Sequence, residues 1–258
     1  MKRWNPATPS AAQPEPRRPR RRVAAAAAAA VVVAGGLSLA AFTVPAARAV
    51  APPASGCAAV NLIVARASTE AAGEGTTQSL ATQIVNSSTQ TVSQEAVVYP
   101  ATLTNYTSSE SQGVTNAEQE LTTAVSRCPN QKEVLLGYSQ GAEVSMDVIA
   151  GNSEAGGTVT PVSTAISSHV VAIANFGDPG HVVGQSWDLG TATRNGLFPR
   201  SSAQLRLLTA FGGSSKIAAW CDANDPYCAS GINLEVHLTY LDRYQSAAAS
   251  FVLGKIGG

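Results

Sequence analysis

The stretch that decides the fold is EVLLGYSQGAEVSMDVIA, from Glu133 to Ala150. It begins with an apolar run typical of a buried strand and continues, from Gly141 onward, in the pattern of a helix. At the junction, GYSQG matches the G-x-S-x-G pattern, in which a serine occupies a tight strand-to-helix turn. Small residues are needed on both sides of that serine, since strand and helix approach closely there. We interpret Ser139 as a candidate nucleophile; an ordinary glycine-rich turn is the alternative.

Short apolar runs and longer helical patterns alternate through the rest of the chain. Strands are expected at 59–65, 95–101, 133–138, 170–176 and 216–221, and helices at 76–86, 114–127, 141–150, 203–211 and 240–255. This alternation predicts one α/β domain with a central parallel sheet covered on both faces. Reactive groups should then lie on the loops that follow the carboxyl ends of the strands.

Composition and charge exclude several kinds of partner. Of 258 residues, 45% are hydrophobic and 13% charged, which is typical of a globular protein. Eight of the 17 Lys and Arg residues precede residue 50; the remainder has nine basic and 16 acidic residues. An acidic body argues against nucleic acid and anionic membrane surfaces as partners.

The N-terminal segment has the pattern of an export signal. A basic run is followed by an uncharged stretch at 23–44 and by Ala47-Arg48-Ala49, which predicts a signal peptide over residues 1–49, cleaved after Ala49, and a secreted protein. The alternative is a permanent anchor that retains the protein at the cell envelope, since 22 residues can span the ~30 Å hydrocarbon core. An Ala- and Pro-rich linker at 50–56 then leads to a domain at 57–258.

All four cysteines, Cys57, Cys128, Cys221 and Cys228, lie in the exported part. An even number in an oxidising compartment predicts two disulfides, with three possible pairings. Metal binding is the alternative, but a C-x-x-C pair and a nearby histidine are both missing from the sequence. We therefore expect neither a metal nor any other cofactor.

A nucleophilic serine needs a base, and the base needs a group that orients it. The three histidines, His169, His181 and His237, all follow Ser139. His237 comes after the last strand, where this architecture usually places its base, and is favoured. His181, in a loop after a strand, remains the alternative.

Several aspartates could orient the base. Asp225 lies within CDANDPYC, a loop that a bridge between its two cysteines would close into a stiff ring. Such a ring would hold the carboxylate rigidly, so Asp225 is favoured. Asp178 and Asp222 are the other candidates. Asp225 and Asp178 each precede a proline, as turn residues often do, so an ordinary turn is the alternative for both. Of these two, only Asp225 lies in the loop that such a bridge would close.

Four motifs in order resemble the cutinase family of secreted serine esterases: ARASTE at 65–70, GYSQGA at 137–142, CDANDPYC at 221–228 and HLTY at 237–240. The resemblance covers about 57–256. It implies a small α/β-hydrolase with a five-stranded parallel sheet, helices on both faces in a three-layer sandwich, and no large lid. It also implies an ester substrate, with no obligate protein partner; we expect a monomer.

The resemblance assigns residue roles by position. Ser139 would be the nucleophile, His237 the base and Asp225 its orienting acid, while Ser68 and the backbone N–H of Gln140 would form the oxyanion hole. Cys57 would pair with Cys128, and Cys221 with Cys228. One departure is Ala67, where the family motif has Gly, which tolerates positive φ.

The expected activity is hydrolysis of carboxylic esters, either cutin-like polyesters or lipid acyl esters. Alternatives are an acetylxylan-type esterase and a non-catalytic secreted binding protein of the same fold. Apolar loop residues that could form a rim for fatty acyl chains are Leu189, Leu197, Phe198 and Ile232.

Overall fold

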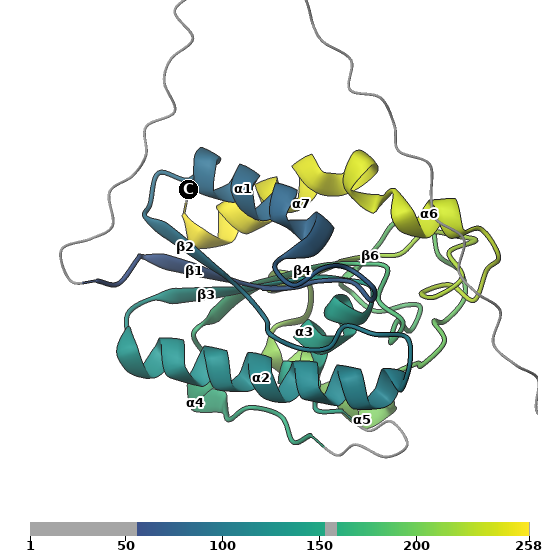
Figure 1. Ribbon diagram of the computed structural model, residues 1–258, viewed down its shortest axis with the longest axis horizontal. Helices are drawn as coiled ribbons and strands as arrows, with labels where there is room; N and C mark the ends of the chain where they lie inside the picture. The colour runs from purple at the N-terminus through teal and green to yellow at the C-terminus, as the bar shows by residue number, and fades with distance from the viewer. Residues whose placement is uncertain (1–55, 153–158, 258) are drawn as a thin grey trace, which may run out of the picture. The chain divides into compact units, whose positions relative to one another are not determined.

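The computed structural model describes residues 56–152 and 159–257, which contain a parallel sheet between two layers of helices (Figure 1). The predicted signal peptide at 1–49 lies outside the described residues. The sheet has six strands in the order β2-β1-β3-β4-β6-β5, all parallel. In chain order they are β1 (Val60–Ala65), β2 (Val92–Ala96), β3 (Lys132–Tyr138), β4 (Val170–Phe176), β5 (Asp188–Leu189) and β6 (Ile217–Trp220).

Helices cover both faces of the sheet, as expected. Two of them, α1 and α7, lie on one face, and α2, α3 and α5 lie on the other (Figure 1). The helices are α1 (Gln78–Ser87), α2 (Tyr106–Arg127), α3 (Gln140–Ala150), α4 (Thr164–Ser167), α5 (Ser202–Phe211), α6 (Leu234–Leu238) and α7 (Tyr240–Ile256), with 3-10 turns η1 (Gly75–Thr77) and η2 (Gly213–Ser215). Among the helices described, none has the length and apolarity needed to cross a bilayer.

Strand β1 shows why these strands are continuous apolar runs. Val60, Leu62 and Val64 pack into the core beneath α1 and α7, whereas Ile63 and Ala65 pack into the core beneath α2 and α3. A parallel strand covered on both faces is apolar at most positions, and Asn61 is the one polar residue of β1. The same burial extends through β3 and β4.

Two differences from the expected elements concern the edges of the sheet. A sixth strand, β5, extends the predicted five; it is only two residues long, too short to leave a periodic signal. Strand β2 lies at Val92–Ala96 rather than at 95–101. The apolar residues Val97, Tyr99 and Ala101 fill the core after the strand has ended, whereas the edge strand itself is partly exposed.

The topology places the candidate site residues at one edge. Strands β1, β3, β4 and β6 are parallel neighbours, so their carboxyl ends meet there. The loops that follow them carry Ser68, Ser139, Asp178 and Asp225 respectively. The disulfide between Cys57 and Cys128 instead joins the segment before β1 to the end of α2.

A buried carboxyl lies near the other end of the sheet. Glu133 on β3 is fully buried; the amide of Asn61 on β1 donates to its Oε2 at 3.1 Å, while its Oε1 has no partner among the described residues. Burial raises the pKa of Glu133 from 4.5 to about 7, with the nearby Glu95 adding to the shift and the Asn61 bond opposing it. The folded protein therefore favours the neutral acid.

We expect Glu133→Gln to stabilise the protein at about pH 8 but not at about pH 4. The Glu133 carboxyl ionises near pH 4.5 in the unfolded chain and near pH 7 in the folded protein. The stability that the neutral carboxyl contributes to the wild type is therefore complete below pH 4.5 and is lost as the pH rises through about 7. The difference between pKa 4.5 and about 7 sets an upper limit of ~3 kcal/mol on the gain at pH 8. Urea unfolding across this range measures it, with the exposed Glu235→Gln as control. An equal effect at both pH values would contradict the prediction.

Candidate active site

Ser139 stands in a strained turn between β3 and α3. Its backbone has φ 55° and ψ −121°, and its N–H donates to the Phe176 carbonyl at 2.8 Å. The glycines beside it are required by closeness: a Cβ on Gly141 would lie 2.0 Å from the Ala65 carbonyl oxygen, and one on Gly137 2.3 Å from that of Gly141. This close strand-to-helix approach is what the G-x-S-x-G pattern predicts.

A line of hydrogen bonds joins Ser139 to a histidine and an aspartate. The His237 Nε2 lies 2.9 Å from Ser139 Oγ, and its Nδ1 lies 2.8 Å from Asp225 Oδ2. All three side chains are largely buried. With the Nδ1 proton donated to the carboxylate, Nε2 accepts the hydroxyl proton, which is the tautomer that a general base requires.

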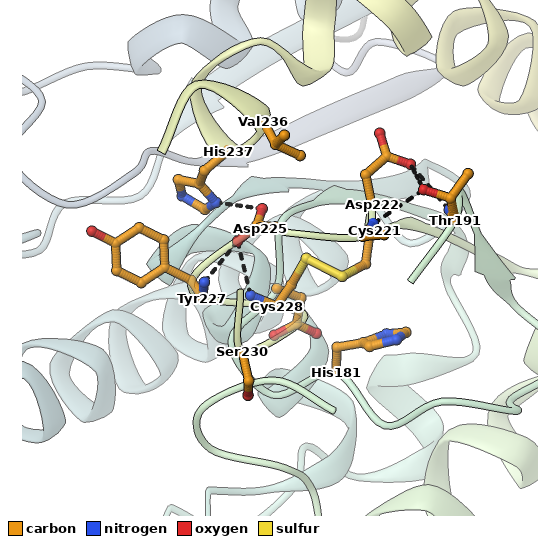
Figure 2. The surroundings of a disulfide bond; sticks show 12 residues. His181, Thr191, Cys221, Asp222, Asp225, Tyr227, Cys228, Ser230, Val236 and His237 are labelled. Carbon is orange, nitrogen blue, oxygen red and sulfur yellow. Dashed lines mark hydrogen bonds and ion pairs between the residues drawn. A yellow bond between two sulfur atoms is a disulfide. The ribbon is translucent and has the colours of Figure 1, made fainter. Parts of the chain in front are cut away.

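A disulfide closes the loop that holds Asp225. Cys221 and Cys228 are bonded, and the backbone N–H groups of Tyr227 and Cys228 donate to Asp225 Oδ1 at 2.7 and 3.0 Å (Figure 2). Burial by itself would raise the pKa of Asp225, but its hydrogen bond to His237, the charge of that ring and these N–H donors lower it. The carboxylate is thus kept ionised and aimed at the imidazole.

Two further groups next to Ser139 are suited to bind a developing oxyanion. The buried hydroxyl of Ser68 has no hydrogen-bond partner among the described residues, and Ser68 lines the same cleft as Ser139. The backbone N–H of Gln140 is in the first turn of α3, where N–H groups have no partner within the helix. The Gln140 side chain is engaged elsewhere, since its Oε1 accepts from Ser109 Oγ at 3.1 Å.

The loop that carries Ser68 is held by Glu70, to which the sequence assigned no role. One carboxylate oxygen of Glu70 accepts from the Ala67 N–H at 2.7 Å, and the other accepts from the Thr76 N–H at 2.7 Å. Positive φ in this loop falls on Thr69 (69°) and not on Ala67. The alanine in place of glycine therefore costs this backbone nothing. The acid within ARASTE was the signal that could have identified this role.

The cleft at Ser139 has a volume of about 480 Å³ and a largely apolar lining. Five of its large apolar side chains are exposed at the rim: Leu103, Leu197, Phe198, Leu234 and Leu238. Leu197 and Phe198 were predicted from the sequence. Leu189 and Ile232 are exposed too, but they do not line this cleft. The walls are loops, helix α6 and the ends of neighbouring elements such as Tyr106 of α2, without a separate lid in the described ranges.

The remaining candidates lie outside the hydrogen-bonded line. Asp178 forms an ion pair with Arg200, a buried residue before α5. His181 is buried with its Nδ1 3.7 Å from Asp188, and burial lowers its pKa. His169 is half-buried just before β4.

Two tyrosines support the imidazole, and the sequence reasoning missed both. The hydroxyl of Tyr138 donates to the His237 carbonyl. The ring of Tyr227 has its centroid 4.4 Å from that of His237 and also lines the cleft. Each stands beside a residue already singled out, Tyr138 before Ser139 and Tyr227 within the stapled loop, and this adjacency was the available signal.

The parallel sheet, the strained serine turn and the hydrogen-bonded serine, histidine and aspartate are the features of the α/β-hydrolase class. Within that class, the chain belongs to the cutinase family, whose profile matches residues 56–256. It is a carboxylic-ester hydrolase, as the family and its named relatives are. The non-catalytic alternative is thereby set aside.

Relatives show the likeness across most of the chain. Acetylxylan esterase 2 of Talaromyces purpureogenus is 30% identical over 212 residues, 78% of this chain and 88% of the relative. Phospholipase Culp4 of Mycobacterium tuberculosis is 30% identical over 221 residues, 85% and 88% respectively. A solved acetylxylan esterase structure has a TM-score of 0.69 and 32% identity, covering 78% of this chain and 100% of that one.

Proposed function

We propose that Ser139, His237 and Asp225 form the catalytic triad of this esterase. The observation that supports the assignment is the line of hydrogen bonds from Ser139 Oγ through both ring nitrogens of His237 to Asp225. Ser139 Oγ attacks the ester carbonyl while its proton passes to Nε2 of His237. His237 then protonates the leaving alcohol, which leaves an acyl-enzyme on Ser139.

The second half of the reaction reuses the same groups. His237 takes a proton from water as the water oxygen attacks the acyl carbonyl. The bond from Ser139 Oγ to the acyl carbon then breaks, His237 returns the proton to Ser139 Oγ, and the carboxylic acid is released. In both halves, the Ser68 hydroxyl and the Gln140 N–H donate to the oxyanion. Ser68 gains there a partner that it lacks in the free protein. Because the substrate oxygen becomes negatively charged only as the tetrahedral state forms, these contacts are stronger in the transition state than in the ground state.

The preferred substrate is an ester with an apolar acyl chain, as in lipid acyl esters and cutin-like polyesters. The rim consists of exposed Leu and Phe side chains, and Glu70 is the one charged acid among the lining residues, with both oxygens bonded. Such a surface gains free energy by covering methylene groups, whereas it offers few polar groups to a sugar. Acetylated xylan, on which relatives act by name, remains the alternative.

A series of p-nitrophenyl esters tests this preference. We expect kcat/KM for the hexanoyl ester to exceed that for the acetyl ester by about 10- to 100-fold, because each buried methylene contributes ~0.8 kcal/mol. Leu103→Ser should reduce the ratio, since Leu103 is at the rim, whereas Leu207→Ser, which is also exposed but lies on α5 outside the cleft, should not. A preference for the acetyl ester would transfer the proposal to acetylated polysaccharides.

We also propose that residues 1–49 direct export, that 50–56 are a linker and that 57–258 act as a monomeric enzyme. Disulfides Cys57–Cys128 and Cys221–Cys228 support an oxidising compartment. Every residue of the proposed site comes from a single chain. N-terminal sequencing of protein from the culture medium, followed by light scattering, tests these statements; an intact Met1 or a stable dimer would contradict them.

A further inference from the structure

The disulfide-closed loop carries two buried carboxylates that point in different directions. Asp225 points toward the ring of His237, whereas Asp222 points toward Thr191 (Figure 2). The two are linked within the loop, because the N–H of Asp225 donates to the Asp222 carbonyl at 3.2 Å. The proposed triad uses Asp225 and leaves Asp222 without a role.

Asp222 is the centre of a dense set of hydrogen bonds. Its Oδ1 accepts from the Thr191 N–H at 3.0 Å and from the Tyr244 hydroxyl at 2.9 Å. Its Oδ2 accepts from Arg243 Nε at 3.1 Å. Only 7% of Asp222 is exposed, so the carboxylate is fixed in one orientation.

Arg243 connects this carboxylate to the main chain beside His237. Its Nη2 lies 3.1 Å from Asp222 Oδ2 and donates to the Val236 carbonyl at 2.9 Å. Its Nη1 donates to the Thr239 hydroxyl. Val236 and Thr239 stand on either side of His237 in the chain, and both belong to α6 or its end. One guanidinium thus ties the segment that carries His237 to the loop that carries Asp225.

This arrangement matters because α6 is otherwise a weak support. It is a helix of five residues, too short to be stable by itself, and Leu234 and Leu238 at its two ends are exposed. The hydroxyl of Tyr138 holds the His237 carbonyl from the side of β3. Arg243, through Asp222, holds the same segment from the side of the stapled loop.

We propose that Asp222 and Arg243 are positioning residues that set the His237 backbone relative to Asp225. The inference rests on the proposed role of His237. The planar guanidinium is suited to the task, since its donors contact a carboxylate and a carbonyl at fixed angles. The Arg243 side chain is 34% exposed, and without it Asp222 Oδ1 keeps the Thr191 N–H and the Tyr244 hydroxyl as donors. Loss of Arg243 should therefore lower stability only in part, through the charge partner that buried Asp222 loses, and should lower catalysis more.

Kinetics of Arg243→Met test the proposal. We expect kcat for p-nitrophenyl hexanoate to fall by about 10- to 100-fold, because small misplacements of a catalytic group have effects of this size. KM should change by less than about twofold, since the cleft lining does not include Arg243. Fluorophosphonate labelling of Ser139 should slow in parallel. Arg206→Met, an exposed arginine on α5, is the matched control and should match the wild type.

Two more variants keep the test decisive. Arg243→Lys retains the charge but cannot contact all three partners, so its kcat should lie between those of Arg243→Met and the wild type. Asp222→Asn should lower kcat, and combining it with Arg243→Met should cost no more than the larger single effect, because both act through one contact. If Arg243→Met proves too unstable to assay, the kcat values of Arg243→Lys and Asp222→Asn test the positioning role in its place.

The outcomes separate this inference from the proposed triad. An active wild type whose Arg243→Met variant matches Arg206→Met overturns the positioning role alone. A kcat loss that disappears after correction for the unfolded fraction also overturns it. A wild type that is neither active nor labelled at Ser139 overturns the proposed triad instead.

Discussion

Ser139→Ala is expected to lower kcat/KM for p-nitrophenyl hexanoate by about 10³-fold or more. The change removes the only atom that the proposed mechanism acylates, and neither His237 nor Ser68 can replace it. Residual turnover would come from the cleft and the oxyanion donors, which still bind the ester. The protein should remain folded, since alanine keeps the small volume that the turn between Gly137 and Gly141 requires.

Two measurements accompany that assay. A fluorophosphonate should label the wild type at Ser139, as located by peptide mapping, and should leave Ser139→Ala unlabelled. Ser250→Ala removes an exposed hydroxyl on α7 and should change neither labelling nor turnover. Undiminished hydrolysis by a folded Ser139→Ala variant would refute the assignment of the nucleophile.

Asp225→Asn is expected to lower kcat by a comparable factor, about 10³-fold. The amide has nearly the shape of the carboxylate, but it carries no charge to stabilise the imidazolium, and its NH₂ group can favour the wrong tautomer of His237. The N–H groups of Tyr227 and Cys228 hold one oxygen of this side chain. The loop should therefore keep its conformation, so KM should change little and a kcat measurement isolates the effect.

Asp178→Asn is the matched comparison, since Asp178 also follows a strand of the sheet and precedes a proline. Its carboxylate pairs with buried Arg200, which also contacts Asp147. Neutralising it should lower Tm, because a buried charge loses one of its partners, while the active enzyme keeps most of its kcat. If Asp178→Asn were the more damaging of the two to kcat, the orienting role would move to Asp178.

How much could be predicted from the sequence differs between elements. Strands β3 and β4 were predicted nearly to the residue, because a strand buried on both faces is a continuous apolar run. Helix α2 begins at Tyr106, eight residues before the apolar pattern that marked it. Its first turns are polar and are held by contacts such as Ser109 with Gln140, which a local pattern does not contain.

The rim of the cleft shows the same limit. Leu197 and Phe198 were anticipated, but Leu103, Leu234 and Leu238 were not. An apolar residue on a loop has no periodicity to show whether it faces the cleft, the core or solvent. Its place depends on how the segments after β2, β5 and β6 fold against one another.

By itself, the sequence determined the elbow at Ser139, the alternation of strands and helices, and the four ordered motifs of the family. These are local features, set by glycine at a close approach and by apolar periodicity. Tertiary structure alone decided that Asp178 forms an ion pair with Arg200 and that Asp225 forms the hydrogen bond with His237. It also decided that Arg243 joins Asp222 to the chain beside that histidine. Such pairings depend on which distant segments meet at the carboxyl edge of the sheet, and a buried charge takes the partner that the fold brings within reach.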